Sequence, residues 1–267
     1  MKLLNYGMPL AACMALLVGC GGSDDPQDEI HYEDRVVEVP GEVVTNRVEY
    51  MPIDGFVLGF WTMDTDANCT GPCLNDHSAY GNSLYLGDMA FAPVTQAPTQ
   101  AGDGAVDEML HLDGNVQAST IDGSVLNDTL VGERFSVLLR ARTQADELHT
   151  LFSLGTASST ALNVQLSRHS LLVELPRQQK RLLVPLSDAS TWQEIQLASD
   201  GERVTLQVGC TQVASFDRAP GQPILSNAAT GVMVGARWGE PASDAFTGDV
   251  DLVRVSRQSE ANLFCSK

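Results

Sequence analysis

Residues 203–217 read R-V-T-L-Q-V-G-C-T-Q-V-A-S-F-D, and apolar side chains alternate with polar ones along this stretch. The same alternation continues in G-V-M-V-G-A-R (231–237) and in F-T-G-D-V-D-L-V-R-V-S-R (246–257). A period of two residues is typical of β-strands that bury one face. These three stretches therefore predict a series of half-buried strands at the end of the chain.

Short strands of the same kind are predicted along the chain from Phe56 onward. Gly, Asp and Asn separate them, and helical periodicity is nearly absent. This pattern predicts an all-β fold, an antiparallel two-sheet β-sandwich of jelly-roll type. Residues 90–107 interrupt the series and predict a long loop, either a binding loop or an insertion without a role. The predicted strands are residues 56–63, 83–87, 109–113, 116–120, 134–142, 149–154, 160–167, 170–175, 180–185, 192–198, 203–209, 211–217, 231–236 and 246–256.

Several motifs in this region resemble the laminin G-like domains, a branch of the concanavalin A-type sandwiches. The motifs V-L-G-F-W-T-M-D (57–64), N-D-H-S-A-Y-G-N-S-L (75–84) and M-L-H-L-D-G (109–114) are similar to the opening strand, Asp/Gly turn and third strand of that family. The closing F-x-G-x-V-D-x-V-R-V run with its final cysteine is also similar, most closely to the thrombospondin N-terminal-like branch. The resemblance covers residues 52–267. It implies the sandwich fold but no particular ligand, because such domains bind many unrelated molecules.

Residues 1–19 are predicted to be a bacterial lipoprotein signal peptide. After Lys2, an apolar run from Met8 to Val18 is too short to span a bilayer, and L-V-G-C (17–20) places a small residue before Cys20. The resemblance to lipoproteins implies cleavage before Cys20 and acylation of this cysteine, which would anchor the protein in the cell envelope, with the outer membrane as the expected site. An ordinary signal peptide with an incidental cysteine is the alternative.

Residues 20–51 are predicted to be an acidic tether, followed by the sandwich domain over residues 52–267. The segment G-G-S-D-D-P-Q-D-E-I-H-Y-E-D (21–34) has too few large apolar side chains to fold alone. Two Val-rich hexads that end at Pro40 and Pro52 predict extended chain, either a stiff stalk or an edge strand.

The cysteines predict disulfides in an oxidising compartment. Loss of the signal peptide and acylation of Cys20 leave four cysteines, which allow three connectivities. The family resemblance implies a Cys210–Cys265 bond. A small Cys69–Cys73 clip is then the second predicted disulfide.

The charge of the chain excludes a nucleic-acid-binding class. The formal net charge is −18, whereas a nucleic-acid footprint needs a basic face. A local exception is P-R-Q-Q-K-R (176–181), where Arg177, Lys180 and Arg181 predict a solvated hairpin tip between two apolar strands.

Calcium is the first candidate cofactor. Hard cations bind several oxygens, and D-T-D-A-N (64–68) and N-D (75–76) supply carboxylates and amides after the first strand. The resemblance adds Asp251, so the predicted calcium ligands are Asp64, Asp76 and Asp251. Asp and Asn also form turns by bonding their own backbone, which is the alternative interpretation.

Zinc is a weaker metal candidate. Cys69, Cys73 and His77 in C-x3-C-x3-H are zinc-type ligands, but a fourth ligand is not evident and an oxidising compartment favours the disulfide.

Catalysis is not predicted. Glycoside hydrolysis needs two carboxyl groups flanking the bond, and no strand carries the E-x-D-x-x-E pattern of laminarinase-like enzymes. Asp249 and Asp251 share a strand face, but they belong to the closing strand of the family. A G-x-S-x-G elbow is also absent from the sequence.

Aromatic residues suggest where a ligand would bind. Trp61 and Trp192 lie within apolar strand patterns and are predicted to be core residues. Trp238, in G-A-R-W-G-E-P, lies in a Gly/Pro turn and is the best candidate for an exposed binding aromatic, with Arg237 beside it to pair with an anionic group.

These patterns predict a lipid-anchored envelope protein that binds a glycan or a protein without catalysis. A structural subunit of an outer-membrane or filament assembly is the alternative, and a large exposed apolar patch would favour it. A divergent glycoside hydrolase is the third hypothesis, which a pair of carboxylates in a cleft would favour.

Overall fold

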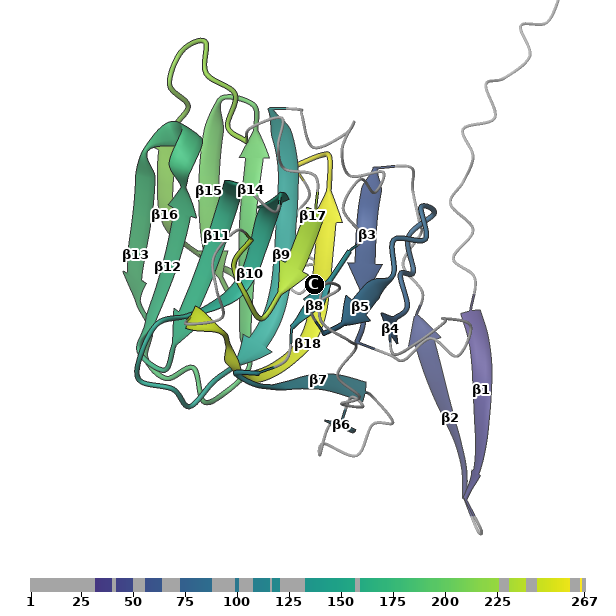
Figure 1. Ribbon diagram of the computed structural model, residues 1–267. Helices are drawn as coiled ribbons and strands as arrows, with labels where there is room; N and C mark the ends of the chain where they lie inside the picture. Colours follow the sequence, from purple (N-terminus) through teal and green to yellow (C-terminus); the bar gives the residue numbers. More distant parts are fainter. Residues whose placement is uncertain are drawn as a thin grey trace, which may run out of the picture. The chain divides into compact units, whose positions relative to one another are not determined.

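The computed structural model in Figure 1 describes residues 32–39, 42–49, 56–63, 73–87, 99–100, 108–115, 117–120, 133–156, 159–225, 231–238, 244–259 and 265. The chain divides into two compact units, Met1–Pro52 and Ile53–Lys267. The predicted signal peptide and Cys20 lie outside the described residues and stay predictions. Within the described ranges, no helix is long and apolar enough to cross a membrane.

The first unit contains a β-hairpin. Strands β1 (Tyr32–Val39) and β2 (Glu42–Glu49) pair antiparallel, with Val39 opposite Glu42. The sequence predicts extended chain here, as a stalk or an edge strand. The strands are extended, and they pair with each other because only two positions, Pro40 and Gly41, separate them in the sequence.

The second unit is an antiparallel β-sandwich. Sheet I has the strand order β13-β12-β11-β10-β17-β8-β5-β4, and sheet II has the order β16-β15-β14-β9-β18-β7-β6, with β3 paired to β18 as well. Figure 1 shows β13, β12 and β11 of sheet I lying against β16, β15 and β14 of sheet II. The strands of sheet I are β4 (Cys73–Leu74), β5 (Leu84–Leu86), β8 (Ala118–Ser119), β10 (His149–Thr156), β11 (Ser159–Ser167), β12 (Ser170–Leu175), β13 (Lys180–Pro185) and β17 (Gly231–Val234). Those of sheet II are β3 (Val57–Trp61), β6 (Thr99–Gln100), β7 (Glu108–Asp113), β9 (Arg134–Arg142), β14 (Gln193–Asp200), β15 (Arg203–Val208), β16 (Thr211–Asp217) and β18 (Thr247–Ser256).

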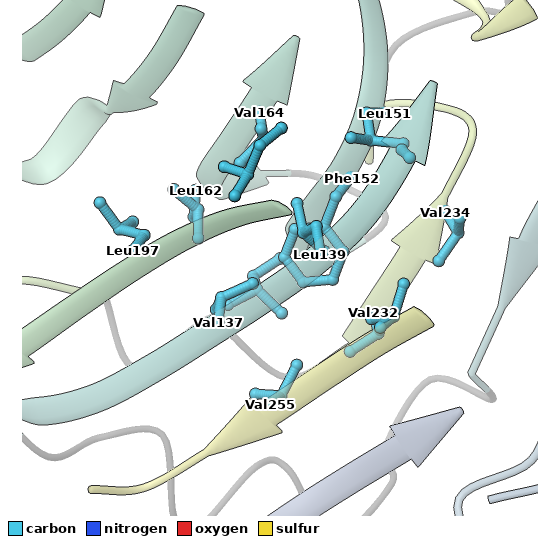
Figure 2. Packing of buried hydrophobic residues seen from close by; sticks show 14 of the residues in the cluster. Val137, Leu139, Leu151, Phe152, Leu162, Val164, Leu197, Val232, Val234 and Val255 are labelled. Atoms are coloured by element: carbon cyan, nitrogen blue, oxygen red, sulfur yellow. The ribbon is translucent and has the colours of Figure 1, made fainter. Parts of the chain in front are cut away.

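The predicted all-β sandwich is confirmed, and alternation fixes which faces meet. In β9, Val137 and Leu139 are buried in the core, whereas Arg140 and Arg142 lie on the other face of the strand. Figure 2 shows Val137 and Leu139 from sheet II packed with side chains of sheet I, including Phe152. Because each fully buried Leu or Phe stabilises the fold by about 1.5–3 kcal/mol, this layer is the main source of stability.

Most predicted strands appear with nearly the predicted bounds. Strands β9, β12, β13 and β16 have the predicted bounds, while two-residue strands β4 and β6 were not expected. Short strands of this kind carry too few residues to show alternation. Most of the predicted long loop, including residues 91–98, lies outside the described residues.

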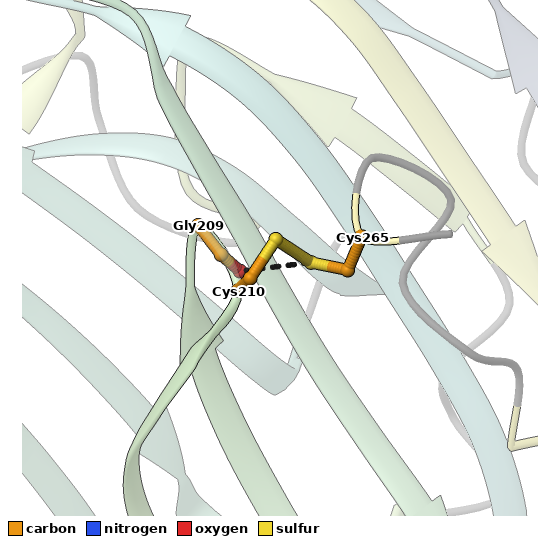
Figure 3. Close-up of a disulfide and its surroundings, with 3 residues drawn as sticks. All are labelled: Gly209, Cys210 and Cys265. Atoms are coloured by element: carbon orange, nitrogen blue, oxygen red, sulfur yellow. Dashed lines mark hydrogen bonds between the residues drawn. A yellow bond between two sulfur atoms is a disulfide. The ribbon is translucent and has the colours of Figure 1, made fainter. Parts of the chain in front are cut away.

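A disulfide joins Cys210 to Cys265, as the family resemblance implies (Figure 3). Cys210 lies between β15 and β16, and its Cα is 5.4 Å from that of Cys265. The Cys265 sulfur also contacts the Gly209 carbonyl oxygen at 3.6 Å. The bond therefore ties Cys265 to the β15–β16 hairpin.

Candidate functional site

The Asp76 carboxylate is fully engaged by hydrogen-bond donors of the protein. Its Oδ1 accepts from the backbone N–H groups of Phe60 and Ser78, both at 2.8 Å. Its Oδ2 accepts from the Ser78 hydroxyl at 2.7 Å and from the Asn82 N–H at 2.6 Å. Asp76 is 7% exposed, so this arrangement ties the 76–82 loop to β3. Asp76 therefore has the turn-forming role that is the alternative to calcium binding in the sequence analysis.

Asp251 forms an ion pair with Arg140. Its Oδ2 accepts from Arg140 Nη1 at 2.7 Å, and a bulge between Val250 and Leu252 gives this side chain its position. Asp64 lies outside the described residues. In the described part of the chain, no three His, Cys, Asp or Glu side chains gather as a metal site would require. The calcium site stays a prediction.

Two of the three predicted zinc ligands, Cys73 and His77, have other contacts. Cys73 is disulfide-bonded, and its predicted partner Cys69 lies outside the described residues. His77 forms a hydrogen bond of 2.9 Å through Nε2 to the Thr62 hydroxyl.

Trp238 is not the exposed aromatic that the sequence predicts. It is 9% exposed and packs with Met233 and Ala236 over sheet I. Its indole N–H donates to the Gly231 carbonyl at 3.1 Å, and a Cβ at Gly231 would lie 2.6 Å from its ring. The turn residues around Trp238 suggested exposure, but the glycine-lined surface beneath the indole buries it.

Arg237 lies beside Trp238 and reaches the edge of sheet I. Its Nε donates to the Thr160 hydroxyl at 3.3 Å, and its Nη1 pairs with Glu174 at 3.4 Å. It lines a small cavity, which we call the Arg237 notch.

A larger cleft lies at one end of sheet II. It has a volume of about 670 Å³, within the range of about 300–1,000 Å³ typical of ligand pockets. We call it the Arg142 cleft, and it is lined by His111, Arg142, Thr143, Gln144, Ala145, Ser190, Thr247, Gly248 and Asp249.

Three neighbouring strands build the polar centre of the Arg142 cleft. The antiparallel registers place Asp249 of β18 opposite Arg142 of β9 and opposite His111 of β7. Arg142 Nε donates to Asp249 Oδ2 at 2.7 Å, and His111 Nδ1 donates to Asp249 Oδ1 at 2.7 Å. The Asp249 side chain is 15% exposed, whereas His111 is 48% exposed. Asp249 thus holds two donor-bearing side chains at the surface of the cleft.

The Trp192 ring lies next to this polar centre and contacts two arginines of β9. The Arg142 guanidinium carbon lies 4.6 Å from the centroid of the Trp192 ring, and that of Arg140 lies 5.3 Å from it. Such cation–π contacts stabilise by about 0.5–1 kcal/mol at exposed sites. Trp192 is partly buried and lies outside the core cluster, so the prediction that it is a core residue is wrong.

The rim of the cleft is cross-linked by hydrogen bonds. The Thr143 hydroxyl donates to the Thr247 carbonyl at 2.6 Å and accepts from the Ala145 N–H at 3.1 Å. A Cβ at Gly248 would lie 2.3 Å from the Arg142 carbonyl oxygen, so only glycine allows this approach of the strands. The cleft is therefore preformed.

A turn that contributes partly buried Ser190 to the lining of the cleft follows β13. Asp188 Oδ1 accepts from the Ser190 N–H at 3.0 Å and from Arg168 Nε at 3.2 Å. The hydrogen bonds from Ser190, followed by those from Arg168, lower the pKa of the Asp188 carboxyl to about 2.

Sequence patterns contained a signal for the Arg142 cleft. Arg140 and Arg142 lie on one strand face, as Asp249 and Asp251 do, and both pairs have the same spacing with opposite charges. The missing information was that β9 and β18 are neighbours in sheet II. That pairing spans 107 residues between Arg142 and Asp249, so local alternation does not reveal it.

Three solved structures share the fold of this chain. Domain 4 of AbnA, a GH43 extracellular arabinanase from Geobacillus stearothermophilus, in complex with arabinotriose, aligns with a TM-score of 0.52 at 14% identity, over 78% of this chain and 96% of that domain. The binding domain of botulinum neurotoxin serotype D aligns with a TM-score of 0.54 at 12% identity, over 77% of this chain and 48% of its own. The binding domain of botulinum neurotoxin DC in complex with SialylT aligns with a TM-score of 0.51 at 10% identity, over 79% and 50%.

This chain thus spans about half of each neurotoxin binding domain and nearly all of the arabinanase domain. No family model matches the sequence, and no curated protein matches it. At these identities the likeness shows the fold alone: the chain from Ile53 onward is an antiparallel β-sandwich.

Proposed function

We propose that this protein binds a glycan in the Arg142 cleft without converting it. The observation that carries the proposal is the Asp249 carboxylate, held by His111 and Arg142 at the surface of a preformed polar cleft. Sugar hydroxyls both donate and accept hydrogen bonds, and this cleft presents both kinds of group: donors on Arg142 and an acceptor on Asp249. Because the rim is already ordered, little conformational entropy is lost when a ligand binds.

Neutral groups of the cleft add to this recognition. Gln144 and Ser190 line the cleft, and each provides donors and acceptors. Trp192 is not a lining residue, but its ring lies 4.6 Å from the Arg142 guanidinium carbon and supports this side chain. Two of the similar structures were determined with carbohydrate-related ligands, arabinotriose and SialylT. These neighbours support the choice of a glycan over other ligand classes.

The proposal assigns no catalysis to the cleft. Among the described residues that line it, Asp249 is the only carboxylic acid, and it is engaged by Arg142 and His111. Glycoside hydrolysis generally needs a second carboxyl group about 5–10 Å away. This favours binding over hydrolysis.

The proposal also places the protein in a bacterial envelope as a lipoprotein with a laminin G-like domain. The support is the sequence of residues 1–20 and the motifs quoted above, and acylation of Cys20 would hold the sandwich at a membrane surface.

A glycan-array screen of the full chain tests this function. We expect binding to a subset of oligosaccharides, and no shortened products by mass spectrometry after prolonged incubation. Parallel arrays with calcium and with chelator test the predicted calcium site: loss of binding in chelator would move recognition from the Arg142 cleft to the region of Asp64 and Asp251. Absence of any glycan binding in both conditions, or release of shorter oligosaccharides, would contradict the proposal.

A further inference from the structure

The Arg237 notch is a second concave site, on sheet I. It has a volume of about 260 Å³ and is lined by Glu174, Pro176, Gln179, Lys180, Arg181 and Arg237. The sequence separates Arg237 from the other five residues by more than 50 positions. They meet because β12 and β13 form the edge of sheet I and Arg237 lies against β11 and β12.

The β12–β13 connection that carries Lys180 and Arg181 is a built turn. Gln178 is 6% exposed, and its side chain donates to the Pro223 carbonyl at 2.9 Å and accepts from the Ala219 N–H at 3.1 Å. The next residue, Gln179, has φ +52°, a left-handed conformation that costs a non-glycine residue about 1–2 kcal/mol. The sequence predicts only a solvated hairpin tip here, whereas the buried Gln178 amide fixes the turn to a neighbouring segment.

Arg237 is also held in place. The Thr160 hydroxyl accepts from Arg237 Nε at 3.3 Å and donates to the Trp238 carbonyl at 2.9 Å. The buried Trp238 therefore anchors the backbone next to Arg237, and Glu174 orients its guanidinium.

Charge distinguishes the notch from the rest of the molecule. Lys180, Arg181 and Arg237 contribute three positive charges and Glu174 one negative charge, so the lining carries a net charge of +2. The whole chain carries −18. An anion repelled by most of this surface is attracted to the notch.

Glu174 does not neutralise the site. It pairs with Arg181 Nε at 3.0 Å and accepts from the Asn163 side-chain amide at 3.2 Å. A guanidinium carries five N–H donors, and the Arg181 side chain is 71% exposed, so the pair with Glu174 leaves donors that face solvent. Glu174 positions the cations, while their excess charge remains.

We propose that the Arg237 notch binds an oxyanion, the carboxylate or sulfate group of an acidic sugar. Arg181 and Arg237 would donate hydrogen bonds to the anion, and Lys180 would add charge without a fixed geometry. The volume of about 260 Å³ lies just below the range of pockets for drug-sized ligands, which fits one charged sugar residue. This site goes beyond the proposed function, because it lies on the opposite sheet from the Arg142 cleft.

Titration of the full chain with three small probes tests this inference. The probes are glucuronate, inorganic sulfate and glucose, the last being a neutral sugar with the same ring as glucuronate. Binding is followed by calorimetry and by NMR of the arginine Nε–H groups at low ionic strength. We expect glucuronate, sulfate or both to bind and shift the Arg181 and Arg237 signals, and glucose to have no effect. Raising NaCl from about 20 to about 300 mM should weaken binding, because the cations are close to solvent and screened by salt.

Variants locate the site. Arg237→Gln and Arg181→Gln should each weaken anion binding at least about fivefold, because each removes a charge-assisted hydrogen bond. Arg168→Gln is the matched control, since Arg168 also forms an exposed ion pair but lies between β11 and β12, at the other end of β12 from the notch. This control should change the affinity less than twofold.

The two anions distinguish the ligand chemistry. Selective binding of glucuronate assigns a carboxylate site, selective binding of sulfate assigns a tetrahedral-oxyanion site, and both results support the proposal. Binding of neither anion, equal binding of glucose, or unchanged affinity in both arginine variants would overturn it. Substitution of Arg142 should leave anion binding at the notch unchanged, so failure of this inference and failure of the proposed function are separate results.

Discussion

The Asp76 carboxylate concentrates four hydrogen bonds on one side chain. Asp76→Asn replaces one acceptor oxygen by an NH2 group, which leaves buried donors facing another donor. We expect the free energy of unfolding to fall by about 3 kcal/mol, measured by urea denaturation. Asp217→Asn, which removes an exposed ion pair with Arg203, is the control and should cost less than about 1 kcal/mol. Equal losses in the two variants would contradict this role of Asp76.

The same measurement addresses the predicted metal. A calcium ion that binds only the folded protein raises the free energy of unfolding, and above the Kd this increase grows with the logarithm of the calcium concentration. Wild-type unfolding curves with calcium and with chelator therefore test the site predicted at Asp64, Asp76 and Asp251.

The lowered pKa of Asp188 predicts that its turn contributes less stability in acid. Hydrogen bonds from Ser190, then the pair with Arg168, lower its pKa from 3.8 to about 2 in the folded state. A lowered folded-state pKa means that the stabilisation is present above the unfolded pKa and is lost as the pH falls through the folded pKa. The free energy of unfolding should therefore decline between about pH 4 and pH 2 more steeply in the wild type than in Asp188→Asn. Identical pH profiles would show that Asp188 does not contribute.

At the scale of elements, the pairing of β9 with β18 creates the candidate site. Alternation within β9 is visible in the sequence, and its bounds of 134–142 were predicted for that reason. The register that places Arg142 opposite Asp249 of β18 depends on two strands that are distant in the sequence, and the bulge at Asp251 has no sequence signal of its own.

 The position of Arg142 next to Asp249 could therefore not be read from either strand alone.

The Cys210–Cys265 disulfide links the β15–β16 hairpin covalently to the segment that follows β18. It closes a loop with a sequence separation of 55 residues, for which the chain-entropy model gives about 4 kcal/mol of stabilisation. The double variant Cys210→Ser/Cys265→Ser, which leaves no unpaired thiol from this bond, should lose stability of that size in urea denaturation. A loss below about 1 kcal/mol would mean that the bond does not constrain the unfolded chain as the model assumes.

At the scale of the whole molecule, the sequence predicted the architecture well and the residues of the candidate site poorly. Alternation in the strands identified the sandwich and buried Trp61, because each strand shows its apolar face locally. The two other tryptophans were assigned the wrong way round. Trp238 is covered by contacts with Gly231 and Gly155, and Trp192 lies against arginines of a neighbouring strand. Both outcomes depend on tertiary packing, which a local pattern does not contain.

The proposed envelope location concerns the whole chain and rests on Cys20. If this cysteine is acylated, the full-length protein expressed in a bacterium should appear in the membrane fraction and require detergent for extraction. Cys20→Ser should shift it to the soluble fraction, with Cys13→Ser as the matched control that leaves the anchor intact. Equal membrane retention of the wild type and Cys20→Ser would contradict the lipoprotein assignment.

The most direct test of glycan recognition is the affinity of the Arg142 cleft for the best oligosaccharide found on the array. Calorimetric titration would compare the full-length wild type with Arg142→Lys, which keeps the charge but loses the Nε–H bond to Asp249 and the planar contact with Trp192. Arg203→Lys is the control, because Arg203 also donates to an aspartate through Nε but lies on β15. We predict that Arg142→Lys binds roughly tenfold more weakly, equivalent to about 1.4 kcal/mol, and that Arg203→Lys binds like the wild type. Equal affinity in all three proteins would contradict glycan recognition by this cleft.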